Sequence, residues 1–332
     1  MINRQFTLAA RPLGMPKESD FALVESPLSE PGNGEVLAKA VYISVDPYMR
    51  ARMSGGSAYP DPLDIGDTMV ALGIGRVIES QNPAFAAGEL VLGEWGWREY
   101  SVSDGSRWLK LPPSAAPVST RLGVLGMPGI TAYFGLLDVC RPKAGDTVVV
   151  SAAAGAVGSL AGQIAKIKGC RTAGITGTDA KVEYLVNELG FDGAFNYKAS
   201  ADYTNSLTRL CPDGIDCYFD NVGGFVTDAV LPLMKPFGRV ALCGLISEYN
   251  LDQPEPGPGP LRPILLNQLR MEGFLFTRFQ NRWGEALTQI AQWLSEGRLT
   301  YREAIVDGFT NLPRALIGLL SGENIGKMLV RL

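Results

Sequence analysis

Apolar and polar positions follow two different rhythms along the chain. Up to about residue 120, short apolar runs alternate with turn-forming residues; the runs are 36–45, 70–78, 90–92 and 100–102, and the turns lie at 31–34, 55–56 and 87–89. Short runs broken by frequent turns are typical of strands in a small β-barrel or sandwich. The first part of the chain is therefore predicted to be a β-rich domain.

From about residue 145, strand-like and helical runs alternate instead. The strand-like runs are 147–151, 172–175, 215–220 and 240–243, and the helical ones are 157–168, 180–189 and 225–234. This alternation predicts βαβ units, that is, a parallel sheet with helices on both faces. A later apolar stripe predicts a helix over 283–296 that ends at Gly297; the stripe is Leu287, Ile290, Ala291 and Leu294.

The composition fits a globular protein that has no polyanionic partner. The 332 residues are 46% hydrophobic, and a prior of about 150 residues per domain gives two domains. The net charge is -4, and no long run of like charges offers a surface for nucleic acid or anionic lipid. No apolar stretch reaches the ~20 residues that span a bilayer, and the first residues lack the apolar core of a secretory signal. We therefore expect a cytoplasmic protein whose partner is a small molecule.

Histidine is absent from the sequence, which narrows the possible chemistry. A zinc site needs about four thiolate, imidazole or carboxylate ligands close together, so neither a structural nor a catalytic metal is expected. A Ser-His-Asp triad is excluded, and protons must be handled by tyrosine, lysine, a carboxylate or a cofactor. Reduced thiols are expected rather than disulfides, because the five cysteines are odd in number and scattered: Cys140, Cys170, Cys211, Cys217 and Cys243.

A glycine-containing turn joins the first strand of the second part to its first helix. The segment 151–158 reads Ser-Ala-Ala-Ala-Gly-Ala-Val-Gly, an Ala-x-Gly-x-x-Gly pattern between strand and helix. Gly155 lets the backbone approach a pyrophosphate, Gly158 lets the helix lie close to the strand, and the helix N-terminus offers N–H groups to an anion. The turn predicts a bound dinucleotide, although Ala153 replaces the first glycine; tight packing without a ligand is the alternative.

The end of the next strand indicates which dinucleotide binds. NAD sites place a carboxylate there, against the ribose 2'-hydroxyl. This chain instead has Thr176 and Thr178, with Asp179 only beyond them and Lys181 following. Hydroxyl and cationic donors suit a 2'-phosphate, so NADPH is expected rather than NADH. The alternative is that Lys181 is an ordinary solvated lysine.

Several longer motifs together resemble a known family. They are 152–158 with 162–166, 195–198, 213–224 and 243–250, and the likeness extends along the chain to 46–50, 126–129 and 324–327. The chain is similar to the zinc-free prostaglandin reductase and alkenal/one oxidoreductase branch of the medium-chain dehydrogenase/reductases. Bacterial curcumin reductases look like its near relatives.

The resemblance implies an α/β protein with a GroES-like β-rich catalytic domain at 1–122 and a Rossmann domain at 123–297, the latter a doubly wound parallel sheet. Residues 298–332 would return to the catalytic domain. It also implies NADPH-dependent reduction of the carbon–carbon double bond of α,β-unsaturated aldehydes and ketones, and a homodimer, since relatives commonly pair through their Rossmann domains.

Carried over position by position, the resemblance implies a set of cofactor contacts. The pyrophosphate would be held by Gly155, Ala156, Val157 and Gly158. The adenosine phosphate end would be held by Lys181 and Tyr197, together with Thr176. The rest of the cofactor would lie along Asn221, Cys243, Gly244, Leu245, Ile246, Ser247, Tyr249, Phe274, Leu275, Phe276 and Asn324. Zinc-containing relatives carry cysteine, histidine and glutamate ligands near the segments that correspond to residues 44–47 and 65–67 of this chain. This chain has no histidine at either place.

A reduction of this kind needs a hydrogen-bond donor for the enolate oxygen that forms once hydride reaches the β-carbon. A neutral phenol suits that task. Tyr249, in the loop after the strand that ends at Cys243, is the first candidate, because ligands bind at the carboxyl ends of such strands. Tyr48 and Tyr59, from the other domain, are the next candidates to close the cleft. Each could instead be a packing or loop tyrosine, and water or the cofactor ribose hydroxyl could protonate the α-carbon.

Two further segments have simple interpretations. Asp46, Arg50 and Arg52 are interpreted as a solvated turn with an ion pair rather than as an anchor for a substrate carboxylate. The proline-rich segment 254–260 is interpreted as an exposed connector, with a wall of the substrate cleft as the alternative.

Two other functions stay open on the sequence. A quinone is also a doubly activated enone, so a quinone reductase of the same superfamily is one alternative. A non-catalytic dinucleotide-binding protein is the other, although the tyrosines of the predicted cleft argue against it. A zinc alcohol dehydrogenase lacks its ligands here.

Overall fold

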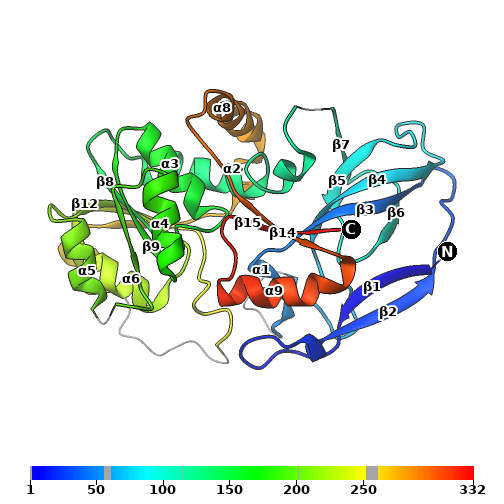
Figure 1. Ribbon diagram of the computed structural model, residues 1–332, viewed down its shortest axis with the longest axis horizontal. Helices are drawn as coiled ribbons and strands as arrows, with labels where there is room; N and C mark the ends of the chain where they lie inside the picture. Colours follow the sequence, from blue (N-terminus) through cyan, green and yellow to red (C-terminus); the bar gives the residue numbers. More distant parts are fainter. Residues whose placement is uncertain (1, 56–60, 114, 201, 252–260) are drawn as a thin grey trace. The chain divides into compact units, whose positions relative to one another are not determined.

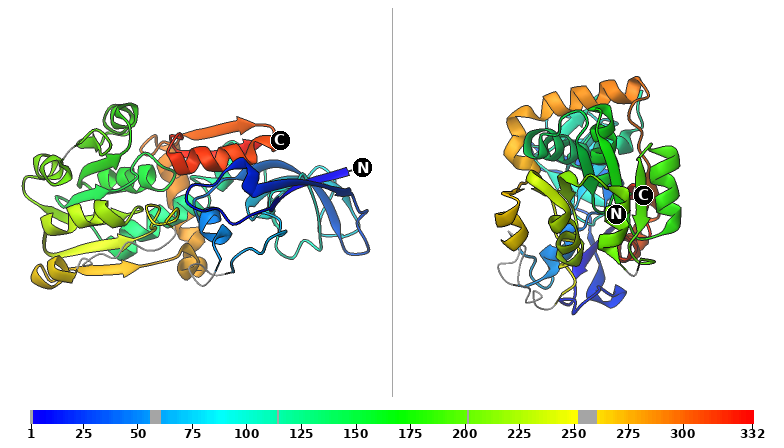
Figure 2. Two further views of the ribbon diagram at one scale, coloured as in Figure 1. Left: turned by 90° about the horizontal axis from the view of Figure 1, so that it is seen from below. Right: turned by 90° about the vertical axis from the view of Figure 1, so that its left-hand side faces the viewer.

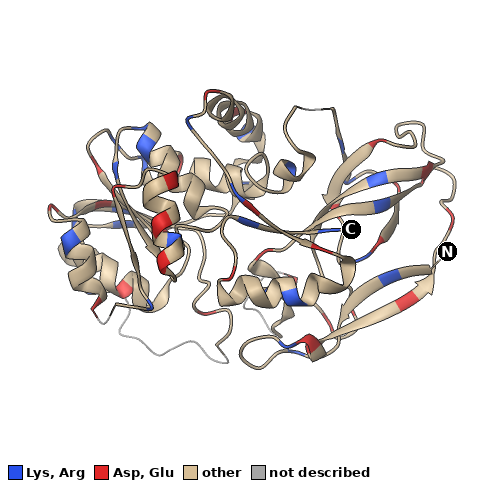
Figure 3. Cartoon of the chain, in the orientation of Figure 1, with Lys and Arg blue, Asp and Glu red and all other residues tan. Residues whose placement is uncertain are grey.

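The computed structural model describes residues 2–55, 61–113, 115–200, 202–251 and 261–332 (Figure 1). The chain forms two compact units, which we call the β-rich unit (Met1–Leu122 and Glu303–Leu332) and the parallel-sheet unit (Gly123–Arg302). Acidic and basic residues are interspersed over both units (Figure 3). Within the ranges described, no helix is long and apolar enough to cross a membrane.

The β-rich unit contains a seven-stranded sheet and a separate hairpin. The sheet has the order β14-β15-β3-β4-β5-β7, and β6 pairs with β3. Its strands are β3 (Val36–Ser44), β4 (Leu72–Ser80), β5 (Leu90–Glu94), β6 (Tyr100–Ser103), β7 (Leu109–Leu111), β14 (Glu303–Asp307) and β15 (Lys327–Arg331). The antiparallel hairpin pairs β1 (Ile2–Leu8) with β2 (Phe21–Pro27).

The helices of the β-rich unit are short. They are η1 (Glu18–Asp20), α1 (Tyr48–Met53), η2 (Val118–Leu122), η7 (Phe309–Asn311) and α9 (Leu312–Ser321). The core of this unit contains buried tryptophan side chains. Two glycines of β4 make room for the ring of one of them. A Cβ atom at Gly75 would lie 2.0 Å from Cη2 of Trp95, and one at Gly73 would lie 2.6 Å from its Cβ. The glycines therefore let the indole lie flat against the sheet.

The parallel-sheet unit is built on six strands in the order β10-β9-β8-β11-β12-β13. Every pairing between them is parallel. The strands are β8 (Thr147–Val150), β9 (Arg171–Thr176), β10 (Gly193–Asn196), β11 (Ile215–Asp220), β12 (Met234–Leu242) and β13 (Arg270–Gly273). This is the parallel sheet that the alternation of strand-like and helical runs predicts.

Helices cover both faces of this sheet (Figure 2). On one face, Tyr218 of β11 packs in a cluster with Leu207 and Val226. On the other, the ring of the next residue, Phe219, reaches within 2.7 Å of the position of a Cβ at Gly135. The helices are α2 (Met127–Phe134), η3 (Gly135–Cys140), α3 (Gly158–Ile167), α4 (Asp179–Glu183), η4 (Tyr184–Glu188), α5 (Tyr203–Leu210), α6 (Gly224–Val230), η5 (Leu231–Leu233), α7 (Leu261–Leu266), η6 (Phe276–Arg282) and α8 (Trp283–Ser295).

The charged turn at 46–52 is buried, so its interpretation as a solvated turn was wrong. Asp46 is 5% exposed and Arg50 is 2% exposed. Arg50 donates hydrogen bonds to the carbonyl oxygens of Pro12 at 3.3 Å and Gly14 at 2.9 Å, and Asp46 pairs with Lys327. These partners lie far away in the sequence, and they supply the hydrogen bonds without which burial of a charge is unfavourable.

Candidate functional site

The predicted cofactor residues of the parallel-sheet unit lie at the carboxyl ends of its strands. Residues 155–158 follow β8, Thr176 ends β9, Tyr197 follows β10, Asn221 follows β11, 243–249 follow β12 and 274–276 follow β13. Because all six strands run in the same direction, these ends share one edge of the sheet. Ligands of open α/β sheets bind outside that edge, so this edge is the candidate site.

The turn between β8 and α3 is tightly closed. The N–H of Gly155 donates to the carbonyl oxygen of Ala152 at 3.0 Å, and Ala152 has a left-handed φ of 47°. A Cβ atom at Gly158 would lie 2.4 Å from the same oxygen and 2.9 Å from Cα of Ala153. The first turn of α3 can therefore approach the end of β8 only because residue 158 is glycine. This bare backbone beside a helix N-terminus fits a pyrophosphate.

One buried carboxylate organises the centre of the site. Asp220, the last residue of β11, is fully buried. Its Oδ1 accepts hydrogen bonds from the hydroxyls of Tyr218 at 2.8 Å and Ser151 at 3.1 Å, and from the N–H groups of Val222 at 2.9 Å and Gly223 at 3.0 Å. Its Oδ2 accepts from the hydroxyl of Thr227. Five hydrogen-bond donors therefore converge on this one carboxylate.

Asp220 and its neighbours connect the glycine turn to the loop after β12. On one side, Asn221 donates from its backbone N–H to Oγ of Ser151 at 2.8 Å and from Nδ2 to the Ser151 carbonyl at 2.7 Å. On the other side, the carbonyl of Asp220 accepts from the N–H groups of Cys243 at 2.8 Å and Gly244 at 3.1 Å. The ends of three adjacent strands, β8, β11 and β12, are thereby fixed relative to one another.

The loop after β12 carries the first candidate for catalysis. Ser247 donates from its backbone N–H at 3.1 Å and from Oγ at 2.6 Å to the carbonyl of Val222. The hydroxyl of Tyr249, a half-buried residue, lies 3.7 Å from the position of a Cβ at Gly244. The phenol is thus directed back over the end of β12. Burial and the charge of Asp220 raise the pKa of the Cys243 thiol to about 12, so this thiol stays protonated at neutral pH.

Two lysines lie together beyond the end of β9. A Cβ atom at Gly177 would lie 3.3 Å from Cε1 of Tyr197 and 3.4 Å from Cε of Lys198. Lys181 is close enough to Lys198 for the second ammonium, together with burial as the larger cause, to lower the pKa of Lys181. Asp179, the nearest carboxylate along the chain, accepts a hydrogen bond from Nδ2 of Asn196 at 3.0 Å. Two neighbouring cations beside a tyrosine form a donor set that fits a phosphate group.

The segment after β13 is divided between core and surface. The ring of Phe274 packs against that of Phe219 at 6.2 Å, and the ring of Phe276 stacks on Trp283 at 5.2 Å. Leu275 is exposed between them. Any contact that Phe274 makes with a cofactor would therefore come from its main chain.

Two of the predicted residues belong to the β-rich unit, and one lies outside the described residues. Tyr48 is the half-buried first residue of α1. Asn324 is buried and donates from Nδ2 to the carbonyl of Gly326 at 2.7 Å. Tyr59 lies outside the described residues, as does the proline-rich segment 254–260.

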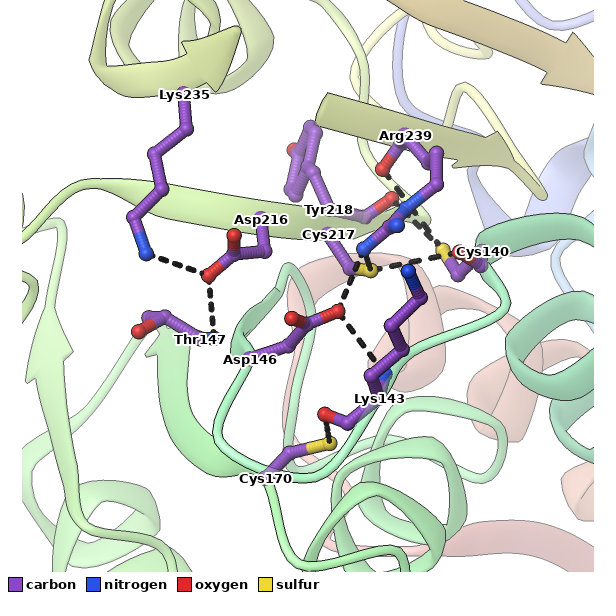
Figure 4. A network of polar contacts seen from close by, with 10 residues as sticks. All are labelled: Cys140, Lys143, Asp146, Thr147, Cys170, Asp216, Cys217, Tyr218, Lys235 and Arg239. Carbon is purple, nitrogen blue, oxygen red and sulfur yellow. Dashed lines mark hydrogen bonds and ion pairs between the residues drawn. The ribbon is translucent and has the colours of Figure 1, made fainter. Parts of the chain in front are cut away.

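The amino ends of the same strands carry a different network of charges (Figure 4). Asp216, at the start of β11, accepts from the N–H of Thr147 and from Nζ of Lys235, both at 2.8 Å. Arg239 donates to Asp146 at 2.6 Å and to Sγ of Cys217 at 3.1 Å. These contacts join strands to one another at the end of the sheet that ligands do not use, so we assign them a structural role.

Sequence reasoning assigned no individual role to four residues of this site. Ser151, Asp220 and Thr227 form the hydrogen-bonded centre, and Lys198 completes the pair of lysines. A polar residue at the end of a predicted buried strand was the available signal for Ser151 and Asp220. For Lys198 the signal was its place directly after Tyr197. Within the described ranges, no group of three or more histidine, cysteine, aspartate or glutamate side chains is placed to hold a metal ion.

Both units of the chain are similar to known oxidoreductases. Residues 4–111 match a family model described as the N-terminal domain of oxidoreductase, and residues 156–292 match one described as zinc-binding dehydrogenase. The chain is 50% identical to prostaglandin reductase 1 of Oryctolagus cuniculus, over 98% of this chain and 92% of that protein. It is 45% identical to the NADPH-dependent curcumin reductase of Escherichia coli strain K12, over 99% of this chain and 96% of that protein.

A solved structure is also similar to this chain over nearly its whole length. The crystal structure of CurA in complex with NADPH from Vibrio vulnificus matches with a TM-score of 0.95 and 45% sequence identity, over 99% of this chain and 98% of that chain. The expected α/β class, with a GroES-like domain and a Rossmann domain, is confirmed.

Proposed function

We propose, since this chain belongs to the zinc-free prostaglandin reductase branch of the medium-chain dehydrogenase/reductases, that it reduces the carbon–carbon double bond of α,β-unsaturated aldehydes and ketones. The chain is an NADP-dependent oxidoreductase, like the relatives that match it at 44% to 50% identity over its full length. The observation that carries the proposal is this full-length similarity to enzymes named prostaglandin, curcumin and 2-alkenal reductases.

NADPH is the cofactor of this chain. When bound, it supplies the hydride that the reduction needs. We assign the glycine turn at 155–158 to the pyrophosphate, because its backbone leads into the N-terminus of α3, where N–H groups and the helix dipole favour an anion. We assign the 2'-phosphate to Lys181 and Lys198, with Tyr197 beside them, because two cations at the end of β9 with no carboxylate at that strand end suit a doubly charged anion.

Tyr249 is the residue we assign to the substrate oxygen. Negative charge develops on that oxygen during the reaction, and a hydroxyl placed in advance stabilises it without reorganisation. Tyr249 meets this requirement because its loop is fixed through Gly244 and Ser247 to the end of β11, and because its hydroxyl lies back over Gly244. Tyr48, at the start of α1 in the β-rich unit, remains the second candidate, and Tyr59 the third.

Replacing Tyr249 with phenylalanine is expected to lower kcat for an enone by about 100-fold, the loss seen when a single donor to a developing oxyanion is removed. The dissociation constant for NADPH should stay near that of the wild type. Steady-state kinetics with a fixed enone measure the first quantity and a fluorescence titration the second. A loss confined to KM would indicate a binding contact instead.

A matched control is available on α2. Tyr133→Phe also removes one phenolic hydroxyl, in this case one that bonds to Glu285 at 3.1 Å. Its kcat should equal that of the wild type. A Tyr249→Phe variant as active as Tyr133→Phe would contradict the donor role.

A substrate panel tests the proposed function. NADPH oxidation is measured with 2-alkenals, aryl enones such as curcumin, 15-keto-prostanoids and quinones, each also with NADH. The proposal predicts turnover of the enals and enones and a saturated carbonyl product. Turnover of quinones alone would favour the quinone reductase alternative, and absence of all turnover would favour a dinucleotide-binding protein without catalysis.

We extend the proposal to a cytoplasmic homodimer. Strand β13 ends the parallel sheet, and beside it α7 exposes Leu261, Leu265 and Leu266. An edge strand next to exposed leucines suits pairing with a second copy of the chain. Five free cysteines suit a reducing compartment. Sedimentation equilibrium should give twice the chain mass, and a monomer at micromolar concentration would contradict the dimer.

A further inference from the structure

A buried lysine of the β-rich unit has all its hydrogen-bond donors engaged. The Nζ atom of Lys327, the first residue of β15, lies 2.7 Å from the carbonyl oxygen of Val45 and 2.8 Å from that of Met328. It lies 3.1 Å from Oδ1 of Asp46. An ammonium group has three N–H donors, so these acceptors use all of them. Lys327 therefore cannot give a hydrogen bond or a proton to a substrate without losing one of these contacts.

Two carboxylates compensate the buried ammonium. The side chain of Asp46 is 7% exposed, and its Oδ2 also accepts from the hydroxyl of Ser44. Glu303 of β14 is the register partner of Lys327. Burial lowers the pKa of Lys327, and the charges of Asp46 and then Glu303 oppose this shift. Well-packed apolar side chains often replace such a buried pair at no loss of stability, so stability alone gives little reason for this one.

The contacts of Lys327 join two loops that matter for the proposed reaction. Val45 and Asp46 lead directly into α1, whose first residue is Tyr48. In the other loop, Asn324 bonds to the carbonyl of Gly326 one residue before Lys327. One side chain thus connects the segment that carries Tyr48 with the segment that carries Asn324, which are the two described residues of the β-rich unit predicted to meet substrate or cofactor.

We propose that Lys327 is a positioning residue for the reduction, and that it acts by fixing the Val45 carbonyl and the Asp46 carboxylate so that Tyr48 and Asn324 keep their orientation. The inference rests on the proposed function, because it gives these two residues a reaction to serve. An apolar side chain at position 327 would fill the same volume, but it would hold neither the carbonyl nor the carboxylate in place.

Three variants of the full-length protein test the proposal: Lys327→Met, Asp46→Leu and the double variant. Each single change leaves one buried charge without its partner, so both should lower Tm. The double change removes both members of the pair and leaves only Glu303, a half-buried carboxylate whose pKa is already raised by burial, so its Tm should return toward the wild-type value. In all three, kcat for an enone should fall by about 10-fold to 100-fold, as for a displaced catalytic group. The dissociation constant for NADPH should change little, because most assigned cofactor contacts lie in the parallel-sheet unit.

The decisive result is a double variant in which Tm recovers and kcat does not. A purely structural ion pair predicts that both recover together, and that outcome would overturn the proposal. Val91→Ala on β5, which truncates a fully buried core residue, serves as the control for destabilisation; it should lower Tm and leave kcat unchanged. If Lys327→Met fails to fold, Asp46→Leu decides alone, because it removes the carboxylate contact and retains both carbonyl contacts of the ammonium. A kcat equal to that of Val91→Ala would overturn the proposal, and a lower one would support it.

Failure of the proposed function has a different signature. In that case the wild-type protein itself would not turn over enones, whereas failure of the positioning role leaves the wild type active and lets kcat recover together with Tm in the double variant.

Discussion

The Asp220→Ala variant is expected to lose at least about 3 kcal/mol of unfolding free energy, because each buried donor left without its acceptor costs ~1 to 3 kcal/mol. Its affinity for NADPH should fall by about 100-fold, since the glycine turn and the loop after β12 would no longer be held together. The hydroxyls of Ser151, Tyr218 and Thr227 would each lose an acceptor in the interior. Urea unfolding measures the first effect and a fluorescence titration with NADPH the second.

Two controls separate geometry from charge and from stability. Asp220→Asn retains an oxygen at the position of Oδ1, which accepts four of the five hydrogen bonds described, so NADPH affinity should stay within about tenfold of the wild type. Asp216→Ala removes a carboxylate at the other end of β11, where it bonds to Thr147 and Lys235 (Figure 4). It should cost stability without weakening NADPH binding. Wild-type NADPH affinity in Asp220→Ala would contradict the organising role of this carboxylate.

Replacing both Lys181 and Lys198 with alanine is expected to raise KM for NADPH by at least about 100-fold, because hydrogen bonds to a charged group each contribute ~1.5 to 3 kcal/mol. Each single change should raise it by about tenfold or more on the same basis. NADH lacks the 2'-phosphate, so its KM should not change, and the preference for NADPH should disappear. Initial rates with both cofactors at a saturating enone concentration measure this.

Lys166→Ala provides the matched control for charge. Lys166 lies near the end of α3 and pairs with Asp192 at 3.0 Å, away from the end of β9. Its removal should leave both KM values unchanged. Equal losses for NADPH and NADH in the double variant would show that the two lysines do not recognise the 2'-phosphate.

Strands were predictable where apolar runs had clear limits. Strand β11 spans Ile215–Asp220 as predicted, because polar residues bound a short apolar run. Strand β12 begins at Met234, six residues before the predicted start at residue 240. Its first part reads Lys-Pro-Phe-Gly, a sequence that favours a turn, and Phe237 has a left-handed φ of 65°. The pairing of Ile215 with Met234 nonetheless extends the strand, and no local pattern reveals that pairing.

The buried face of α8 shows how packing partners change a predicted stripe. The helix and its end at Gly297, with a φ of 68°, are close to the prediction. Ile290 is buried as expected, but the other buried residues are Ala286 and Trp293, and Ala291 is exposed. The ring of Trp293 packs against Tyr133 of α2 at 6.0 Å. The helix is therefore rotated toward a partner that lies 160 positions earlier in the chain, and its own periodicity could not show this.

The same limit applies to the site. The glycine turn and Lys181 were predictable because strand, turn, helix and charge follow one another within about 30 residues, the size of one βαβ unit. The centre of the site was not, since Asp220 and Ser151 are 69 residues apart. The contact between Lys327 and Val45 spans 282 residues. Local spacing indicates which ligand a chain can hold, whereas the groups that hold the site itself together come from distant segments.

Isotopic labelling follows the transferred hydride from the cofactor into the product. The protein is given an enone and NADPH that carries deuterium on either face of C4, and the product is analysed by mass spectrometry and NMR. We predict that one of the two labelled cofactors transfers a single deuterium to the β-carbon of a saturated ketone. Deuterium on the carbinol carbon of an allylic alcohol, or no transfer from either cofactor, would contradict the claim that this chain reduces activated carbon–carbon double bonds.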